Sequence, residues 1–212
     1  MSKSEYTFPY DTCEKVRSSG PAQPYSVVIN SVSCLVLLYF LSQCKSWSSF
    51  SVIFVLLAFE VVHILSHYKH ISGFIQVNII HALSYAFNMT LLYLFYTHTG
   101  GQLSNYFITL LLGLVMIDLY AFYNLSTIYY LNSQIIIIIS ILLYYYRFLD
   151  KQLQKSLNYI IILIIVIVLL FINEFYNCKK MLNKYPNFPF HVFPEIVGFV
   201  IFYLYGSNFS KL

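Results

Sequence analysis

Glu60, His63 and His67 are the residues whose types and spacing first suggest chemistry. Glu60 lies three residues before His63, and His67 lies four residues after it, so in a helix all three project from one face. Imidazole and carboxylate groups are zinc ligands, and they also hydrogen bond to one another. The spacing therefore predicts either a metal site or a hydrogen-bonded cluster on this helix.

The composition indicates that this helix lies in a membrane. Of the 212 residues, 59% are hydrophobic and only 9% are charged, which does not fit a soluble domain. A spanning helix needs roughly 20 mostly apolar residues. The stretches that qualify are 26–43, 49–66, 72–97, 104–123, 125–146, 156–176 and 188–206. We therefore expect an all-α integral membrane bundle of seven transmembrane helices over residues 26–212.

Residues 1–25 are predicted to form an extramembrane N-terminal arm. They include charged residues and prolines, and they lack the order of basic, apolar and small residues that marks a signal peptide. The arm shares one side of the membrane with the ends of the second, fourth and sixth helices and the starts of the third, fifth and seventh. We call this end of the bundle side A and the opposite end side B.

Most acidic residues and histidines are predicted to lie toward side A. The acidic residues there are Glu5, Asp11, Glu14, Glu60, Asp118, Glu174 and Glu195, and the histidines are His63, His67, His70, His81 and His191. Asp150 and His98 fall toward side B. An ionisable group at membrane depth costs several kcal/mol unless it is paired, hydrated or bound to a metal. Several of these residues could therefore share one functional pocket.

Some of these residues are expected to be functional and others to be structural. His63 and His191 are favoured as functional, whereas His67, Lys69 and His70 are expected to be interface residues where the second helix leaves the membrane. Glu60 and Asp118 could serve function or could lock the bundle through hydroxyl and amide partners. His81 could be a core histidine with a satisfied hydrogen bond.

The charge of the chain argues against nucleic acid as a partner, but it does not fix the orientation in the membrane. The formal net charge is +4, but the basic residues are scattered and form no continuous stripe, so nucleic acid is not an expected partner. Lys and Arg number seven toward side A and five toward side B, so the positive-inside rule does not decide the orientation. A retinal protein is disfavoured because the seventh helix contains no lysine for a Schiff base.

Parts of the chain resemble the alkaline ceramidases, a family of seven-helix hydrolases within the CREST superfamily. The arm reads D-T-C-E-K at 11–15 and A-Q-P-Y at 22–25, where the family has D-W-C-E-x-N and A-E-F-Y. The seventh helix opens with F-H-V-F-P-E-I at 190–196, against a family pattern of F-H-x-W-W-H-I. His63-Ile-Leu-Ser-His-Tyr is similar to the family's H-x-T-L-x-Y segment. The resemblance thus touches both ends and the second helix.

This resemblance implies an intramembrane zinc held by one histidine of the second helix and two of the seventh. Carried across, the zinc ligands would be His63 and His191, with Glu195 in place of the third histidine. The resemblance also implies a calcium site and a disulfide. The calcium residues would be Asp11, Thr12, Glu14 and Gln23, and the disulfide would join Cys13 to Cys178.

Two groups of the family pattern differ in this chain. The family serine four residues before the helix-two histidine is Phe59 here, and the family aspartate of the third helix falls on Phe74 or, with a short insertion, on Asn78. Zinc accepts two histidines and a glutamate and can keep its fourth position open. Glu60, Asn78, His81 and Asp118 are the candidates to replace the missing catalytic groups.

The leading hypothesis is therefore a zinc-dependent amide hydrolase for ceramide or a related lipid. The alternatives are a lipid-binding pseudoenzyme of the same fold and a b-type cytochrome, since haem needs facing axial histidines. Two stacked haems are disfavoured because only His98 lies toward side B. Since a disulfide persists only in an oxidising compartment, the resemblance favours an endoplasmic reticulum or Golgi membrane with a lumenal N-terminus.

Overall fold

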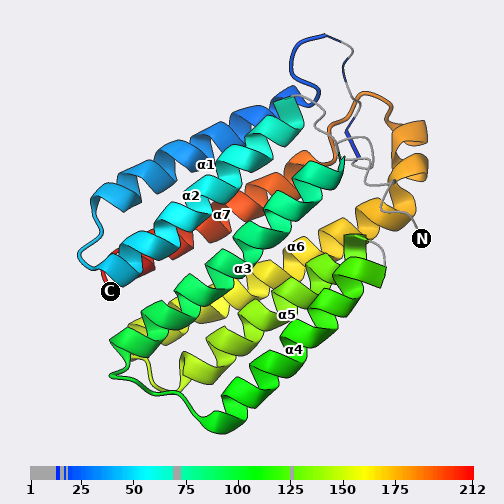
Figure 1. The fold of residues 1–212 in the computed structure, drawn as a ribbon. Coiled ribbons are helices and arrows are strands. Elements are labelled where there is room, and N and C mark those ends of the chain that lie inside the picture. The colour runs from blue at the N-terminus through cyan, green and yellow to red at the C-terminus, as the bar shows by residue number, and fades with distance from the viewer. Residues whose placement is uncertain (1–12, 15–16, 18, 69–72, 125–126) are drawn as a thin grey trace.

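The computed structural model describes residues 13–14, 17, 19–68, 73–124 and 127–212. Seven α-helices and no strand occur in these residues (Figure 1). The helices are α1 (Pro24–Ser42), α2 (Trp47–Tyr68), α3 (Gly73–His98), α4 (Asn105–Asn124), α5 (Thr127–Tyr146), α6 (Lys151–Lys184) and α7 (Val192–Phe209). The all-helical prediction is therefore confirmed.

Six of these helices are long and apolar enough to cross a membrane, namely α1, α2, α3, α4, α6 and α7. In α5 the apolar stretch within the described residues, Ser133–Tyr146, is shorter. The molecule is thus consistent with a multi-pass membrane protein.

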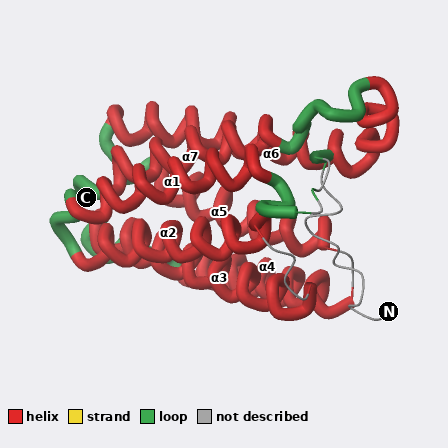
Figure 2. Tube along the Cα trace, turned by 90° about the horizontal axis from the view of Figure 1, so that it is seen from above, coloured by secondary structure: helices red, strands yellow, loops and turns green. Residues whose placement is uncertain are grey.

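The helices lie lengthwise beside one another and form one bundle (Figures 1 and 2). α2 packs between α1 and α3, while α7 packs against α1, α2 and α6. On the other side of the bundle, α5 contacts α3, α4 and α6. The end of α2 and the start of α7 therefore lie at the same end of the bundle, side A.

α6 is longer than the apolar pattern predicts. The apolar stretch covers 156–176, but the helix runs 34 residues from Lys151 to Lys184, or about 51 Å at 1.5 Å per residue. A hydrocarbon core is about 30 Å thick, so α6 extends past it. Glu174 and Cys178, predicted to end or follow this helix, both lie within it. The polar residues continue the helix because no proline or glycine occurs before Pro186.

The large apolar core lies toward side B. Its fully buried members include Ile53 near the start of α2, Phe95 near the end of α3, Leu157 near the start of α6 and Phe209 at the end of α7. Side A instead holds the buried polar residues Glu60, His67, His191 and Glu195. The bundle is thus held together by apolar packing at one end and by polar contacts at the other.

Candidate metal centre

Three histidines surround one carboxylate oxygen, Oε1 of Glu195. Nε2 of His191 lies 2.9 Å from this oxygen, Nε2 of His67 lies 3.0 Å from it and Nε2 of His63 lies 3.7 Å from it. The two Nε2 atoms of His63 and His67 are 3.1 Å apart. Four potential ligand atoms therefore meet at one place between α2 and α7.

Local helix geometry explains this convergence. His63 and His67 are one turn apart on α2, and Glu195 is one turn after His191, which is the N-cap residue of α7. Each pair therefore projects from one face of its helix, and α2 and α7 are in contact. His67 is fully buried, and His191 and Glu195 are 3% and 6% exposed. Such ionisable groups need a partner or a metal at this depth.

The spacing of these atoms fits a zinc ion. Tetrahedral zinc with ligand bonds of about 2.1 Å places its ligand atoms about 3.4 Å from one another. The three distances to Glu195 Oε1 and the distance between Nε2 of His63 and Nε2 of His67 run from 2.9 to 3.7 Å and so bracket that value. The donor atoms of His63, His67 and Glu195 all lie within 4.8 Å of one another. His63, His67 and Glu195 can therefore hold a metal ion, and Nε2 of His191 lies beside the same carboxylate oxygen.

Acceptors behind two of the rings favour a metal at the front. Oε1 of Gln23 lies 2.5 Å from Nδ1 of His67, and Oε2 of Glu174 lies 2.9 Å from Nδ1 of His191. With the proton on Nδ1, each ring turns the lone pair of Nε2 toward Glu195. Metal-binding histidines are oriented by such acceptors. A proton on Nε2 would instead make each ring a hydrogen-bond donor to Glu195 at the same distances.

His63 is held differently. Its Nδ1 lies 3.4 Å from Nδ2 of Asn30 and 3.3 Å from Oε2 of Glu60, which are longer contacts than those of His67 and His191. Its side chain is 21% exposed, whereas that of His67 is fully buried. His63 is therefore the histidine of the cluster that a molecule from outside could reach.

Two backbone hydrogen bonds join the arm to the end of α2. The Ala22 N–H donates to the carbonyl of Tyr68, and the Gln23 N–H donates to the carbonyl of His67. These bonds satisfy carbonyls that a helix end leaves without an internal partner. Gln23 therefore holds His67 twice, through the backbone and through the imidazole ring.

A disulfide joins the arm to α6. Cys13 and Cys178 are bonded, with their Cα atoms 5.3 Å apart, and this is the pairing that the resemblance implies. Cys13 is fully buried. The bond fixes the arm beside Glu174, which lies one helical turn before Cys178.

Two of the four predicted calcium residues, Glu14 and Gln23, lie in the part of the chain that the structure describes. Asp11 and Thr12 lie outside the described residues. Glu14 is 5% exposed and accepts a hydrogen bond from the Ser26 hydroxyl, and burial raises the pKa of its carboxyl. Gln23 contacts His67, so its oxygen supports the histidine cluster. The calcium site stays a prediction.

Asp118 belongs to a second polar cluster, formed by α3, α4 and α5. Its carboxylate lies 2.7 Å from Nε2 of His81 and accepts hydrogen bonds from the Tyr85 and Ser133 hydroxyls at 2.6 and 2.5 Å. Asp118 is fully buried, and the ring of Phe122 stacks on His81. These contacts satisfy the carboxylate, so Asp118 links three helices. Asn78 lies on α3, one turn before His81, and is half-buried.

Three residues at the centre contact the histidine cluster although the sequence pattern does not predict it. His67 was expected at the interface, but the structure places it between Gln23 and Glu195, beneath the arm. Glu174 and Gln23 lie behind the ligand rings. The spacing of four residues between His63 and His67 was the available signal for His67.

Comparisons of this chain with protein-family models, with curated proteins and with solved structures find no match.

Proposed function

We propose that this chain is an intramembrane zinc-dependent hydrolase that cleaves the amide bond of ceramide or a related lipid. The observation that carries the proposal is the convergence of His67, His191 and Glu195, with acceptors behind both rings. The resemblance to the alkaline ceramidases supports the reaction class and the lipid substrate.

A register based on His67 changes which residues stand at the two differing family positions, although it gives up the match of residues 63–68 to the H-x-T-L-x-Y segment. If His67 takes the part of the helix-two histidine, the family's serine position, four residues earlier, falls on His63 and not on Phe59. The family's aspartate position then falls on Asn78 without an insertion. With His67 in that role, the two family positions are occupied by the polar residues His63 and Asn78. With His63 in that role, they are occupied by Phe59 and Phe74.

Zinc at this site would lower the pKa of a coordinated water to about 7 and polarise a carbonyl oxygen. We assign His67, His191 and Glu195 as its ligands because they are the most buried and the most firmly oriented. Catalytic zinc sites have three protein ligands and one open position, whereas structural sites have four protein ligands. His63, the more exposed ring with the longer contacts, is assigned to the open side.

The chain's own residues would then act as follows. Glu60 orients His63 from behind, and Nε2 of His63 accepts a proton from the attacking water and passes it to the leaving amine nitrogen. Glu174 and Gln23 hold His191 and His67 so that the cluster does not rearrange during reaction. A lipid with a long acyl chain would enter sideways between helices.

His63 also separates this proposal from its alternative, a lipid-binding pseudoenzyme with a structural metal. Four protein ligands would close the site, and the 3.1 Å contact between His63 and His67 favours that reading. If His63 is the fourth ligand, its loss weakens metal binding. If His63 faces the substrate, its loss abolishes hydrolysis and leaves the metal bound.

The test measures zinc content and ceramide hydrolysis on the same purified variants. His67→Ala and His191→Ala are expected to lose the zinc, of which the wild type holds about one ion per chain. His63→Ala is expected to keep the zinc while fatty-acid release falls by about 10² to 10⁴. His98→Ala, an exposed histidine on side B, is the matched control and should resemble the wild type.

Three results would overturn the hydrolase proposal. Equal fatty-acid release from the wild type and from His67→Ala would exclude the cluster from catalysis. Loss of zinc from His63→Ala, with no hydrolysis by the wild type, would favour the pseudoenzyme. Absence of zinc together with a Soret band would instead favour a cytochrome.

We further propose that α5 is a seventh membrane span and that side A faces the lumen of the endoplasmic reticulum or Golgi. The Cys13–Cys178 disulfide supports this orientation because such bonds persist in oxidising compartments. Attachment of a glycan to an acceptor sequence fused before the arm would support a lumenal N-terminus, and its absence would oppose it.

A further inference from the structure

A groove between α1 and α7 lies at the opposite end of the bundle from the histidine cluster. Its volume is about 680 Å³, which falls in the usual range for small-molecule sites. Its lining includes Val32, Leu35, Tyr39, Lys45, Ser207 and Lys211. Ser207 is twelve residues after Glu195 on α7, about 18 Å along the helix axis. The groove is therefore distinct from the metal centre.

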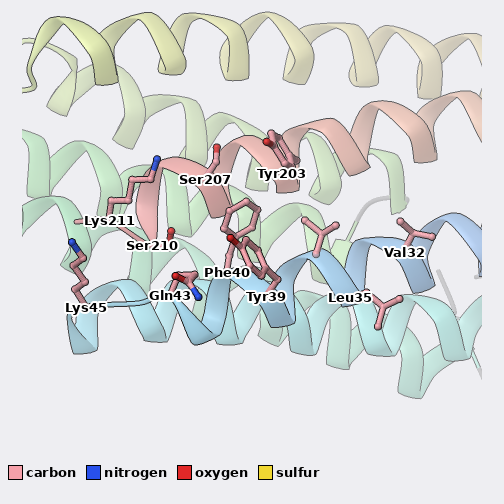
Figure 3. A pocket seen from close by; sticks show the side chains of 11 residues that line it. Val32, Leu35, Tyr39, Phe40, Gln43, Lys45, Tyr203, Ser207, Ser210 and Lys211 are labelled. Atoms are coloured by element: carbon pink, nitrogen blue, oxygen red, sulfur yellow. The ribbon is translucent and has the colours of Figure 1, made fainter.

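Charge is distributed unevenly along this groove. Figure 3 shows Lys45 and Lys211 at one end, from the α1–α2 loop and the residues after α7, and Val32 and Leu35 toward the other end. Gln43, Ser207 and Ser210 add hydrogen-bonding groups near the lysines (Figure 3). The lining residues include no aspartate or glutamate. One end is thus cationic and polar, and the remainder is apolar.

This distribution of charge matches the layers of a lipid bilayer. Val32, Leu35 and Tyr39 are 44%, 66% and 61% exposed, so at the surface of a spanning helix they face acyl chains. Lys45 and Lys211 are exposed at the side B ends of the helices, where a bilayer presents its headgroups. Trp47, 81% exposed and two residues after Lys45, has the position of an interfacial aromatic anchor.

We propose that this groove is a binding site for an anionic glycerophospholipid. The phosphate group lies between Lys45 and Lys211 and accepts hydrogen bonds from Gln43 and Ser207, while one acyl chain follows Tyr39, Leu35 and Val32 along α1. Basic pockets at the ends of transmembrane helices bind anionic headgroups in this way. Free phosphate would use the same lysines but would leave the apolar part of the groove uncovered.

The chain contains a single tryptophan, and this residue provides the measurement. The protein is reconstituted into phosphatidylcholine vesicles, and dibromo-phosphatidylglycerol or dibromo-phosphatidylcholine is titrated in. Bromine on a bound acyl chain quenches the fluorescence of Trp47. The wild type is expected to prefer the anionic lipid about fivefold or more, since one lysine near an anionic surface contributes about fivefold.

Three double variants test whether the preference for the anionic lipid arises in the groove. Lys45→Gln/Lys211→Gln is expected to reduce it to near one. Lys151→Gln/Lys155→Gln removes the same charge from exposed positions at the same end of the bundle and is expected to leave the preference unchanged. Lys45→Arg/Lys211→Arg keeps the charge and is expected to retain it.

Other outcomes would overturn the proposal. If both glutamine pairs reduced the preference for the anionic lipid equally, the preference would come from general attraction to the bilayer surface. If inorganic phosphate competed and the wild type showed no preference between lipids, the groove would be an anion site. A wild type without preference whose oligomeric state changes in Lys45→Gln/Lys211→Gln would identify the groove as a protein interface. None of these readouts depends on hydrolysis, so this proposal stands or falls independently of the proposed function.

Discussion

The histidine cluster depends on the residues behind it as much as on the ligand atoms. Glu174 lies 2.9 Å from Nδ1 of His191, and Glu60 lies 3.3 Å from Nδ1 of His63. Both carboxylates are buried. Only the first stands behind a proposed zinc ligand, so replacing each with the isosteric amide should have different effects.

Glu174→Gln is expected to weaken zinc binding by about 10- to 100-fold, because a neutral acceptor makes the His191 ring a poorer donor to the metal. Competition with a fluorescent zinc chelator measures the change. Glu60→Gln is the matched control and is expected to keep the affinity while it lowers hydrolysis. Similar zinc affinities in the two variants would contradict the assignment of ligands.

Asp118 is expected to stabilise the fold without contributing to the metal site. Asp118→Ala leaves the buried donors of His81, Tyr85 and Ser133 without their acceptor, at a cost of about 3 kcal/mol or more. Thermal unfolding in detergent measures the loss. Asp150→Ala, at the exposed N-cap of α6, should cost only about 1 kcal/mol. Zinc loss from Asp118→Ala that remained folded would show that this carboxylate acts at the site.

Residue spacing could predict part of the centre. The face of Glu60 and His63 follows from helical periodicity, and the resemblance supplied His191, Glu195 and the Cys13–Cys178 pair. Spacing put His67 on the same face, but it could not show that His67 is buried, because whether a histidine near a helix end meets water or protein depends on what covers that end. Here the cover is the arm, whose Gln23 is 44 residues from His67 in the chain.

At the scale of the helices, α1 and α7 meet closely at Gly206. A Cβ atom at this position would lie 2.1 Å from Cδ2 of Phe40, closer than packed atoms can approach. Small residues at helix contacts within membranes allow such close approach.

Gly206→Ala is expected to destabilise the bundle by about 1 to 3 kcal/mol through overpacking, measured by thermal unfolding in detergent. Gly113→Ala on α4, where a Cβ would meet nothing within 4 Å, should cause no loss. Adding Phe40→Ala to Gly206→Ala relieves the clash, so the pair should lose less than the sum of the two single changes. Strict additivity would contradict this packing.

The helices themselves were largely predictable, since an apolar stretch of spanning length has few alternatives in a membrane. The length of α6 was not. Its final residues, including Lys179, Lys180 and Lys184, are as polar as a loop, and hydropathy registers only the segment within lipid. The extension is functional in the structure, because it carries Cys178 to the arm.

Across the whole molecule, the disulfide closes a loop of 165 residues between the arm and α6. Cys13→Ser is expected to lower stability by about 2 to 5 kcal/mol and to speed the transfer of zinc to a chelator, because the arm holds Gln23 against His67. Cys44→Ser, at a cysteine outside any disulfide, is the control. Unchanged zinc release from Cys13→Ser would separate the arm from the centre.

Gln23 contacts both the backbone and the ring of His67, and this has a consequence for biogenesis. α1, α2 and α7 can insert and pack by hydrophobic burial alone, but His67 becomes fixed only after the arm has folded back over α2. The bond that retains the arm needs Cys178, which is translated 165 residues after Cys13. We therefore expect binding of the proposed zinc to be a late event that follows oxidation of the nearly complete chain.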